Sequence, residues 1–474
     1  ADAYAQHCAL CHGATGNGDG PGAHWLTPAP RDFTLGLFAL ASTQNGVPTD
    51  EDLAETIRRG MPGSAMPPFE WMRADELEEM AQYVRHLAIE GLSVSLRESA
   101  AMDGVELNPD EAHGLASMRL TPGDPIDPVE DMPMDEATLQ LGRTLYLEHC
   151  AACHGADGKG RKPVPGWTDT HEIWTVRNFT AGVMKGGATR QELHWRAVAG
   201  IPSSGMPPTR FDDPSHAAAL ISYVEHLIPA GADDRLRQHR TPIAVARVRG
   251  PVPDTADADE WRDAHEVDLT LAPLSWSDDA ITAAKVAALH DGDSIAIRVR
   301  WKDATRDDRM LGSSERGDGV AVQFSAGSRP AVFGMGSAEH PVNIWHWKAF
   351  RFRDVAGITD LQNQPPHGHL ADVPLYQPAP GIAEPATGAD SLRSRGFETL
   401  PQNRDELRVI AAPRYRDGEW SVVFRRAMHA RLSTEIDLRP GSTVQVGVAI
   451  WNGSAPRERD QKATTIWHDL VLDR

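Results

Sequence analysis

The chain has 474 residues, too many for a single domain, and this length indicates about three domains. Its 67 acidic and 47 basic residues give a formal charge of −20, which argues against nucleic acid, because that partner requires a basic face. The acidity fits either a cationic partner or a salty habitat. No apolar run is long enough to span a membrane. Since residue 1 is not Met and no signal peptide is visible, we expect a mature, processed chain.

All four cysteines lie in two C-x-x-C-H frames, Cys8–His12 and Cys150–His154. This frame is the attachment signature of c-type haem, because two thiols one helical turn apart can each bond a vinyl group of one porphyrin while the histidine reaches the iron. A zinc site or a dithiol redox pair is the alternative, but zinc requires ligand pairs that meet, and these frames are far apart in sequence. We therefore predict two covalent haems c. Their attachment residues are Cys8, Cys11, Cys150 and Cys153, and their first iron ligands are His12 and His154.

An internal repeat surrounds the two frames. Each copy reads as a haem helix, a loop region, a Met-Pro-Pro loop and a closing amphipathic helix. The matching segments are Arg31–Thr34 with Arg177–Thr180, Gly60–Pro68 with Gly200–Pro208, and Tyr83–Leu87 with Tyr223–Leu227. Apolar residues at three- and four-residue steps mark one face of each closing helix. These residues are Leu77, Met80, Ala81, Val84 and Leu87 in the first copy, and Leu220, Ile221, Val224 and Leu227 in the second.

The repeat also identifies the second ligand of each iron. The first copy offers Met61 and Met66, but Met61 aligns with Ile201, which cannot bind iron. Met66 aligns with Met206, so we predict Met66 and Met206 as the distal ligands. Histidine–methionine ligation is typical of electron-transfer cytochromes c and raises the haem potential. We interpret Met61 and Met80 as core residues.

Residues 1–92 and 136–232 resemble the class I cytochrome c family, which implies two all-α domains. The resemblance depends on the C-x-x-C-H frame, the Met-Pro-Pro loop and the closing helix. An iron with two protein ligands has no vacant position for peroxide or oxygen, which argues against a di-haem peroxidase or another haem oxidoreductase. Between the copies, residues 93–135 are rich in Pro and acidic residues, and they predict a linker with a short helix near 110–118.

From about residue 251 the periodicity changes from helical to alternating. The alternating runs are 294–301, 320–324, 407–409, 420–424 and 444–450. Asp417-Gly418 predicts a hairpin turn. After a linker at 233–250, roughly seven or more short strands predict an antiparallel β-sandwich over 251–474. Residues 353–405 lack a pattern and predict a functional excursion or a docking loop.

Two stretches of this half, Phe333–Ala349 and Trp451–Trp467, are recognisable. They resemble the haem b-binding γ subunit of ethylbenzene dehydrogenase and its relatives, among them dimethylsulfide dehydrogenase and the corresponding subunit of nitrite oxidoreductases. In that family one Met and one Lys bind a non-covalent haem in the sandwich, and the matching positions here are Met335 and Lys462. The lysine must lose its proton to bind iron. Histidines are the competing ligands: His340, His346, His367, His369, His429 and His468.

The resemblance implies a periplasmic three-haem relay that performs no catalysis itself, with two haems c and one haem b. Its sandwich would dock on the iron–sulfur subunit of a molybdopterin oxidoreductase, and electrons would pass to a soluble cytochrome or terminal oxidase, or in reverse. The sequence contains no recognisable phosphate loop or nucleophile–His–acid set. Three rival hypotheses remain: a haem-free sandwich that binds a partner or sugar, a di-haem peroxidase-type enzyme, and a redox sensor.

Overall fold

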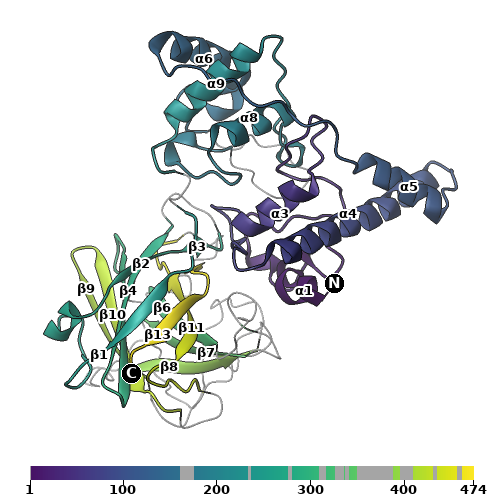
Figure 1. The fold of residues 1–474 in the computed structure, drawn as a ribbon. Coiled ribbons are helices and arrows are strands. Elements are labelled where there is room, and N and C mark those ends of the chain that lie inside the picture. The colour runs from purple at the N-terminus through teal and green to yellow at the C-terminus, as the bar shows by residue number, and fades with distance from the viewer. Residues whose placement is uncertain are drawn as a thin grey trace. The chain divides into compact units, whose positions relative to one another are not determined.

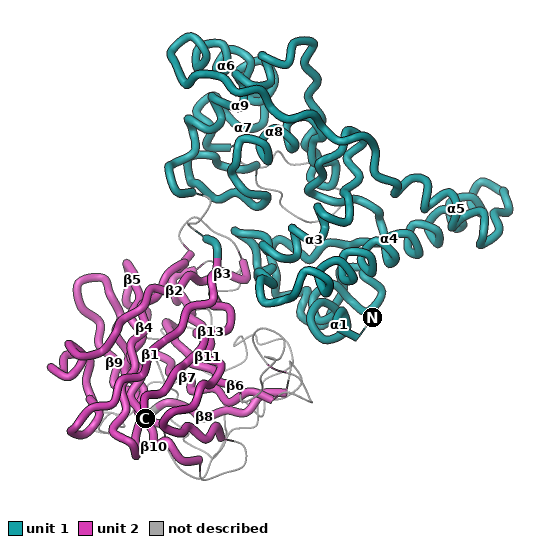
Figure 2. The backbone as a smooth tube through the Cα atoms, in the orientation of Figure 1, with its two compact units in different colours: residues 1–237 teal, residues 238–474 magenta. Residues whose placement is uncertain are grey.

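The chain forms two compact units, residues 1–237 and 238–474, in the computed structural model (Figure 2). The first unit carries the long helices and the second a large β-sheet (Figure 1). Among the described helices, none combines the length and apolar character that crossing a bilayer requires. The described residues are 2–160, 176–232, 236–275, 280–308, 317–325, 336, 341–349, 388–395, 409–430, 435–455 and 462–474.

The first unit repeats one helical arrangement. The first copy has α1 (Asp2–His7), α2 (Ala9–His12), α3 (Asp50–Arg59) and α4 (Ala74–Met102), and the second has α6 (Glu136–His149), α7 (Ala151–His154), α8 (Arg190–Ala199) and α9 (Pro214–Leu227). Short 3-10 helices lie at Ala23–Trp25, Phe179–Ala181 and Pro202–Ser204. Each copy therefore presents its C-x-x-C-H frame on a short helix, α2 or α7, that follows directly on another helix.

Equivalent capping boxes begin α3 and α8. The Thr49 hydroxyl accepts from the Asp52 backbone N–H at 3.0 Å, and the Asp52 carboxylate accepts from the Thr49 backbone N–H at 2.9 Å. Thr189 and Glu192 make the same reciprocal pair at α8, at 3.3 and 3.1 Å. Such a box satisfies two backbone donors that a helix start otherwise leaves without partners.

Each copy has its own hydrophobic core. The predicted apolar face of α4 is confirmed, because all five of its residues are buried. The predicted face of α9 is confirmed as well, with three residues buried and Leu227 partly buried against the same cluster. Both closing helices thus cover the core on which the haem frame of their copy packs, through Cys8 in one and Cys150 in the other.

The stretch between the copies is ordered. Helix α4 continues past residue 92 to Met102, and α5 (Pro109–Arg119) follows where a short helix was predicted. Ala112 and Ala116 of α5 are completely buried, and α4 is the helix on which α5 packs. The first copy therefore extends into a helical hairpin (Figure 1).

After α5 the chain contacts both copies. The Ile126 backbone N–H donates to the Ser42 carbonyl at 2.8 Å in the first copy. A few residues later, the Val129 backbone N–H donates to the Gln191 side-chain oxygen at 2.9 Å in the second. This segment therefore bridges the copies by backbone hydrogen bonds.

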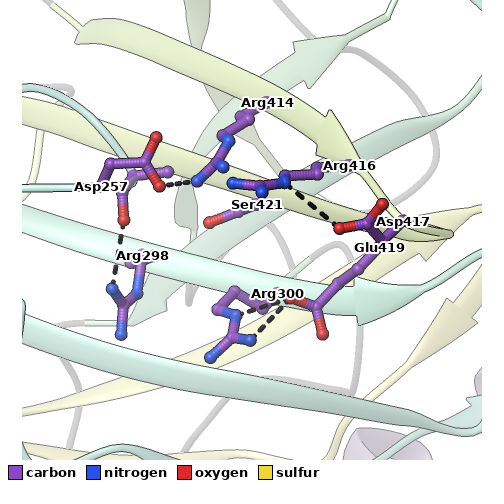
Figure 3. Close-up of a pocket in the computed structure, with 9 residues that line it drawn as sticks. Asp257, Arg298, Arg300, Arg414, Arg416, Asp417, Glu419 and Ser421 are labelled. Carbon is purple, nitrogen blue, oxygen red and sulfur yellow. Dashed lines mark hydrogen bonds and ion pairs between the residues drawn. The ribbon is translucent and has the colours of Figure 1, made fainter.

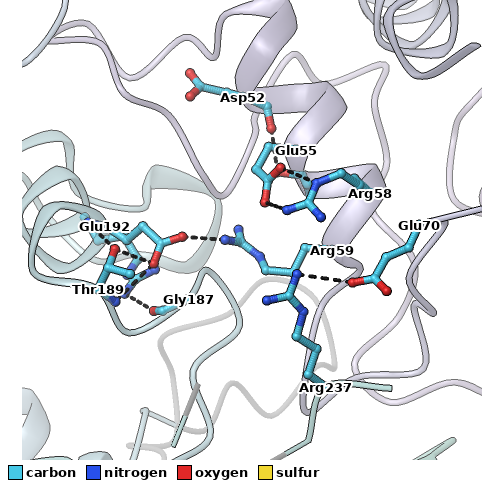
Figure 4. A network of polar contacts seen from close by, with 11 residues as sticks. Asp52, Glu55, Arg58, Arg59, Glu70, Gly187, Thr189, Glu192 and Arg237 are labelled. Atoms are coloured by element: carbon cyan, nitrogen blue, oxygen red, sulfur yellow. Dashed lines mark hydrogen bonds and ion pairs between the residues drawn. The ribbon is translucent and has the colours of Figure 1, made fainter. Parts of the chain in front are cut away.

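A buried ion pair joins the two copies directly (Figure 4). The Arg59 guanidinium at the end of α3 lies 2.5 Å from the Glu192 carboxylate near the start of α8, and these side chains are only 9% and 19% exposed. By contrast, the neighbouring pair Arg58–Glu55 is 39% and 42% exposed and lies within α3. Removing one partner of a buried pair leaves the other charge uncompensated, so breaking Arg59–Glu192 is expected to cost far more stability than breaking the exposed pair.

Replacing Glu192 by Gln should destabilise the helical unit by about 3 kcal/mol, because Arg59 would stay buried without a counter-charge. The amide retains the capping oxygen for Thr189, so the start of α8 is preserved. Urea unfolding followed by helical circular dichroism measures the effect. Glu55→Gln, which breaks the exposed pair with Arg58, should cost about 0.5 kcal/mol or less. Equal costs for the two variants would contradict the role assigned to the interface pair.

The described residues of the second unit form a 13-stranded sheet. Its strands are β1 (Pro242–Arg247), β2 (Val267–Thr270), β3 (Ala272–Pro273), β4 (Ala283–His290), β5 (Ser294–Lys302), β6 (Gly319–Ser325), β7 (Val342–Lys348), β8 (Gly388–Ser394), β9 (Val409–Arg416), β10 (Glu419–Ala427), β11 (Thr443–Trp451), β12 (Lys462–Thr464) and β13 (His468–Leu472). Their order is β13-β1-β4-β5-β10-β9-β8-β7-β6-β11, and β11 pairs back onto β13.

The predicted antiparallel sandwich is therefore corrected to a barrel. A sandwich has two separate sheets, whereas here one sheet closes through the β11–β13 pairing. Two of the pairs, β1–β13 and β1–β4, are parallel. Alternation in the sequence shows which residues face a core, but it does not show which strands meet at the ends of the sheet. Strand β1 also lies within 233–250, the stretch that was predicted to be a linker.

The strand pattern is otherwise confirmed. The predicted runs at 294–301, 320–324, 420–424 and 444–450 lie in β5, β6, β10 and β11. The Asp417-Gly418 turn joins β9 to β10, and both residues have positive φ, as a type I′ turn requires. Residues 407 and 408, and most of the patternless segment 353–405, lie outside the described residues, although β8 falls within that segment.

The carboxylate of Asp318, just before β6, is completely buried and lies beside Trp420. Asp318 accepts from the Asp307 backbone N–H at 2.8 Å, the Trp420 indole N–H at 2.9 Å and the Gly453 backbone N–H at 2.8 Å. Burial raises the pKa of Asp318 to about 6, against the opposing effect of these donors, and the charge of Asp303 adds to the increase. Its ionisation therefore costs stability, and the barrel should lose stability as the pH rises through about 6.

Asp318→Asn should reduce this pH dependence, because an amide stays neutral. In the wild type, the urea midpoint of the barrel should fall between about pH 4 and about pH 7, as the carboxyl ionises in the folded state. In the variant this fall should be smaller, and tryptophan fluorescence provides the measurement. An identical pH response of both proteins would show that Asp318 is not the group responsible.

Candidate haem sites

The histidine of the first C-x-x-C-H frame is held in one tautomer. His12 Nδ1 lies 3.0 Å from the Arg31 carbonyl oxygen, and its ring stacks on Phe33 with centroids 4.6 Å apart and planes 17° apart. A carbonyl only accepts, so Nδ1 carries the proton and Nε2 is the nitrogen that can bind iron. Burial lowers the pKa of His12, which keeps the imidazole in the neutral form that a metal requires.

The second frame has the same geometry. His154 Nδ1 lies 3.2 Å from the Arg177 carbonyl oxygen, and its ring stacks on Phe179 at 4.6 Å and 18°. Burial again lowers the pKa of His154. The structure thus explains the repeated Arg-x-Phe-Thr segment, whose role the sequence did not indicate: its arginine supplies the carbonyl and its phenylalanine supplies the stacking surface.

A tyrosine fixes the turn after each histidine. The Tyr4 hydroxyl donates to the Gly13 carbonyl at 2.9 Å, and the Tyr146 hydroxyl donates to the Gly155 carbonyl at 2.8 Å. Both rings are buried completely or nearly so. The sequence analysis missed these tyrosines. Both lie four residues before the first cysteine of their frame, so an alignment of the two copies places them at the same position.

The environments of Cys8, Cys11 and Cys150 do not favour redox chemistry of these thiols. Burial raises the pKa of Cys8 to about 12, with a contribution from Cys11, and raises those of Cys11 and Cys150 to about 11. A dithiol oxidoreductase needs a lowered pKa on its attacking thiol. These environments therefore favour covalent attachment over a dithiol redox pair. Among the described residues, no group of three or more His, Cys, Asp or Glu side chains could hold a metal ion.

The loops that carry Met66 and Met206 are closed in the same way. The Met61 backbone N–H donates to the Met66 carbonyl at 3.1 Å, and the Ile201 backbone N–H donates to the Met206 carbonyl at 2.8 Å. This agrees with the alignment of Met61 with Ile201. Met66 is partly buried against the core on which Cys8 packs, whereas Met206 is half-exposed.

A glycine lets each of these loops pass close to the preceding helix. A Cβ on Gly60 would lie 2.6 Å from the Pro67 backbone, and one on Gly200 would lie 2.6 Å from the Met206 carbonyl oxygen. Both glycines end their helix with positive φ. The donor chemistry, the stacked histidines and these loops fit one covalent haem c in each copy.

The candidate lysine of the barrel lies on its outer face. Ala463, Ile450 and Val320 belong to the inner core, so their neighbours Lys462 and Trp451 point outward. Lys462 Nζ lies 5.4 Å from the centroid of the Trp451 ring. The predicted partner, Met335, lies outside the described residues.

The barrel interior is filled by side chains. Its fully buried aromatic residues are Trp301, Phe324, Trp345 and Phe424. A second buried apolar cluster lies on the outer face of β6, β7, β8 and β11 and includes Ala321, Ile344, Leu392, Ala449 and Trp467, with Trp451 packed against it. The cluster therefore lies on the same face of the sheet as Lys462.

The competing histidines fall into three environments. His346 lies on the outer face, where its ring stacks on Trp451 at 4.6 Å. His429 is largely exposed and lies 3.5 Å from Asp437. His468 is buried, accepts from the Thr241 backbone N–H at 3.0 Å, and has a pKa that burial lowers to about 4. Outside the described residues lie His340, His367 and His369.

A cavity of about 390 Å³ lies elsewhere on the outer face, between β5, β9 and β10 (Figure 3). Four arginines line it, and each contacts a carboxylate. Arg300 binds Glu266 and Glu419, and the remaining pairs are Arg298–Glu266, Arg414–Asp257 and Arg416–Asp417. These charges balance one another.

Comparison with known families accounts for most of the chain. Residues 258–463 match the ethylbenzene dehydrogenase family, residues 139–227 match the cytochrome c family, and residues 1–84 match subunit III of cbb3-type cytochrome c oxidase. The chain joins two cytochrome c domains to a domain of the ethylbenzene dehydrogenase family. Both predicted resemblances are thereby confirmed.

Three curated proteins are similar to parts of the chain. A haem subunit assigned to the respiratory nitrate reductase of Haloferax mediterranei (ORF7) is 25% identical over 46% of this chain and 67% of its own length. The chlorate reductase γ subunit of Ideonella dechloratans is 25% identical over 51% of this chain and 89% of its own. The dimethylsulfide dehydrogenase γ subunit of Rhodovulum sulfidophilum is 30% identical over 35% of this chain and 50% of its own.

Met66→Ala should open the distal side of the iron in the first cytochrome c domain. The affected haem should bind carbon monoxide when reduced and should titrate at a lower potential, because the thioether no longer stabilises the reduced iron. Met61→Ala is the matched control, since Met61 lies across the same loop, and it should leave both haems c closed to carbon monoxide. Carbon monoxide binding in Met61→Ala but not in Met66→Ala would reverse the assignment.

Proposed function

We propose that the chain is a periplasmic electron-transfer subunit with three haems. Two covalent haems c would be held by the two C-x-x-C-H frames with Met66 and Met206, and one haem b by Met335 and Lys462. Electrons would pass between the iron–sulfur subunit of a molybdenum oxidoreductase and a soluble cytochrome or terminal oxidase. The observation that carries this proposal is the repeated carbonyl–histidine–phenylalanine geometry, in a chain that also has a domain of the ethylbenzene dehydrogenase family.

Each bound haem would supply a one-electron couple, ferric to ferrous. The residues of the cytochrome c domains would orient the iron-binding histidines and would take no part in bond chemistry. The Arg31 and Arg177 carbonyls hold the imidazoles in the tautomer that exposes Nε2. Phe33 and Phe179 fix the ring planes. His12 with Met66, and His154 with Met206, would leave substrate no vacant position on either iron, which favours electron transfer over peroxidase chemistry.

The names of the relatives support the choice of partner complex. Chlorate reductase and dimethylsulfide dehydrogenase each contribute a γ subunit to the comparison, and the Haloferax protein is described as a haem subunit. We therefore infer that this chain also serves a larger oxidoreductase and is not itself an enzyme. Covalent haem attachment favours a location outside the cytoplasmic membrane.

The proposed haem b ligand can be tested by Lys462→Ala. This change should release the non-covalent haem or make it high-spin, while both haems c keep their spectra, because their ligands lie in the other unit. Lys348→Ala is the control: Lys348 also points outward, on β7, opposite Gly319 in the row that includes Trp451. Optical and electron paramagnetic resonance spectra provide the readout.

The same spectra separate the alternatives. Loss of the haem b signal in His346→Ala, with Lys462→Ala unaffected, would transfer the ligand role to the histidine beside Trp451. If Lys462→Ala instead changed a haem c spectrum, the proposed division of cofactors between the units would be wrong.

A further inference from the structure

We propose that a close contact of Gly63 with Val183 and Arg177 couples the two haem c sites electronically. The inference rests on the proposed function, since it takes both C-x-x-C-H frames as haem sites. Gly63 belongs to the first cytochrome c domain, and Val183 and Arg177 belong to the second. The contact connects the distal ligand loop of one site to the segment that supports the proximal ligand of the other.

The backbone at Gly63 approaches the second domain more closely than any other residue type allows. A Cβ at this position would lie 2.4 Å from Val183 Cγ1 and 3.7 Å from Arg177 Nη1. Gly63 also has a φ of +76°, a conformation that favours glycine. Both Gly63 and Val183 are buried, so solvent does not separate them at the contact.

On the first side, the contact belongs to the loop of the proposed distal ligand. Gly63 lies between Met61 and Met66, whose backbones are joined by the 3.1 Å hydrogen bond that closes the loop. The Ser64 N–H and hydroxyl both donate to the Met61 carbonyl, at 3.0 and 2.6 Å. These hydrogen bonds close the turn from Met61 to Met66, so a shift of Gly63 should also shift the backbone of Met66.

On the second side, the contact belongs to the support of the proximal histidine. The Arg177 carbonyl accepts from His154 Nδ1 at 3.2 Å, while the guanidinium of the same residue reaches toward Gly63. Val183 follows the 3-10 helix that begins at Phe179, on which the His154 ring stacks. A chain of packed groups therefore runs from the Met66 loop to His154.

The contact is specific to one orientation of the two domains. In the second domain, Ser203 is the residue that aligns with Gly63, and the glycine of that loop, Gly205, is exposed and has nothing within 4 Å of an added Cβ. The buried Arg59–Glu192 pair holds the first loop in place, because Arg59 immediately precedes Gly60, where that loop begins (Figure 4). The distal side of the first site thus lies against the proximal side of the second.

The test is a double-mutant cycle on the full chain with its haems. Gly63→Ala should push the domains apart and slow electron redistribution between the two haems c after flash reduction, with both haems still low-spin. Val183→Ala removes the methyl group that the new side chain would strike, and the next atom, Val183 Cβ, is at an ordinary 3.8 Å. The double variant should therefore recover much of the rate that Gly63→Ala loses.

Gly104→Ala is the matched control, since Gly104 has a similar φ of +72° but nothing within 4 Å of an added Cβ. It should leave the redistribution rate unchanged. If both haems c are low-spin but the redistribution rate does not change in Gly63→Ala, or falls equally in Gly104→Ala, the coupling role of the Gly63 contact is wrong while the proposed function stands. Absence of two low-spin haems c in the wild type would instead overturn the proposed function.

Discussion

The hydrogen bond from a partly buried histidine to a backbone carbonyl is the interaction on which both cytochrome c sites depend. It occurs twice, from His12 to Arg31 and from His154 to Arg177, and each time a phenylalanine stacks on the ring. An imidazole that is neutral and fixed in one tautomer offers its other nitrogen in a fixed direction. The rest of each domain, from the tyrosine before the frame to the closing helix, keeps this histidine oriented.

Much of the cytochrome c half could be predicted from the sequence, because its signals are local or repeated. The C-x-x-C-H frames identify the cofactor, and comparing the copies distinguishes Met66 from Met61. The carbonyls of Arg31 and Arg177 could not be predicted, since every residue has a carbonyl and only the fold selects one. The same is true of the Arg59–Glu192 pair, whose members are far apart in sequence.

In the second half, alternation predicted individual strands and the Asp417-Gly418 turn, but not the closed barrel. Closure depends on β13, which pairs with both β1 and β11. Pairing between strands that are far apart in sequence leaves no local pattern from which it could be predicted. It also changes where haem b is expected. A sandwich suggests a cofactor within the core, whereas the core of this barrel is packed with aliphatic and aromatic side chains, and the lysine with its apolar neighbours lies outside.

The central claim is that one chain holds two covalent haems and one non-covalent haem as a relay. The pyridine haemochrome spectrum of the purified full-length protein tests it most directly, because haem c and haem b give separate bands and only haem b can be extracted with acidified solvent. We expect haem c and haem b in a ratio of two to one. Haem c alone at two per chain, with nothing extractable, would contradict the account.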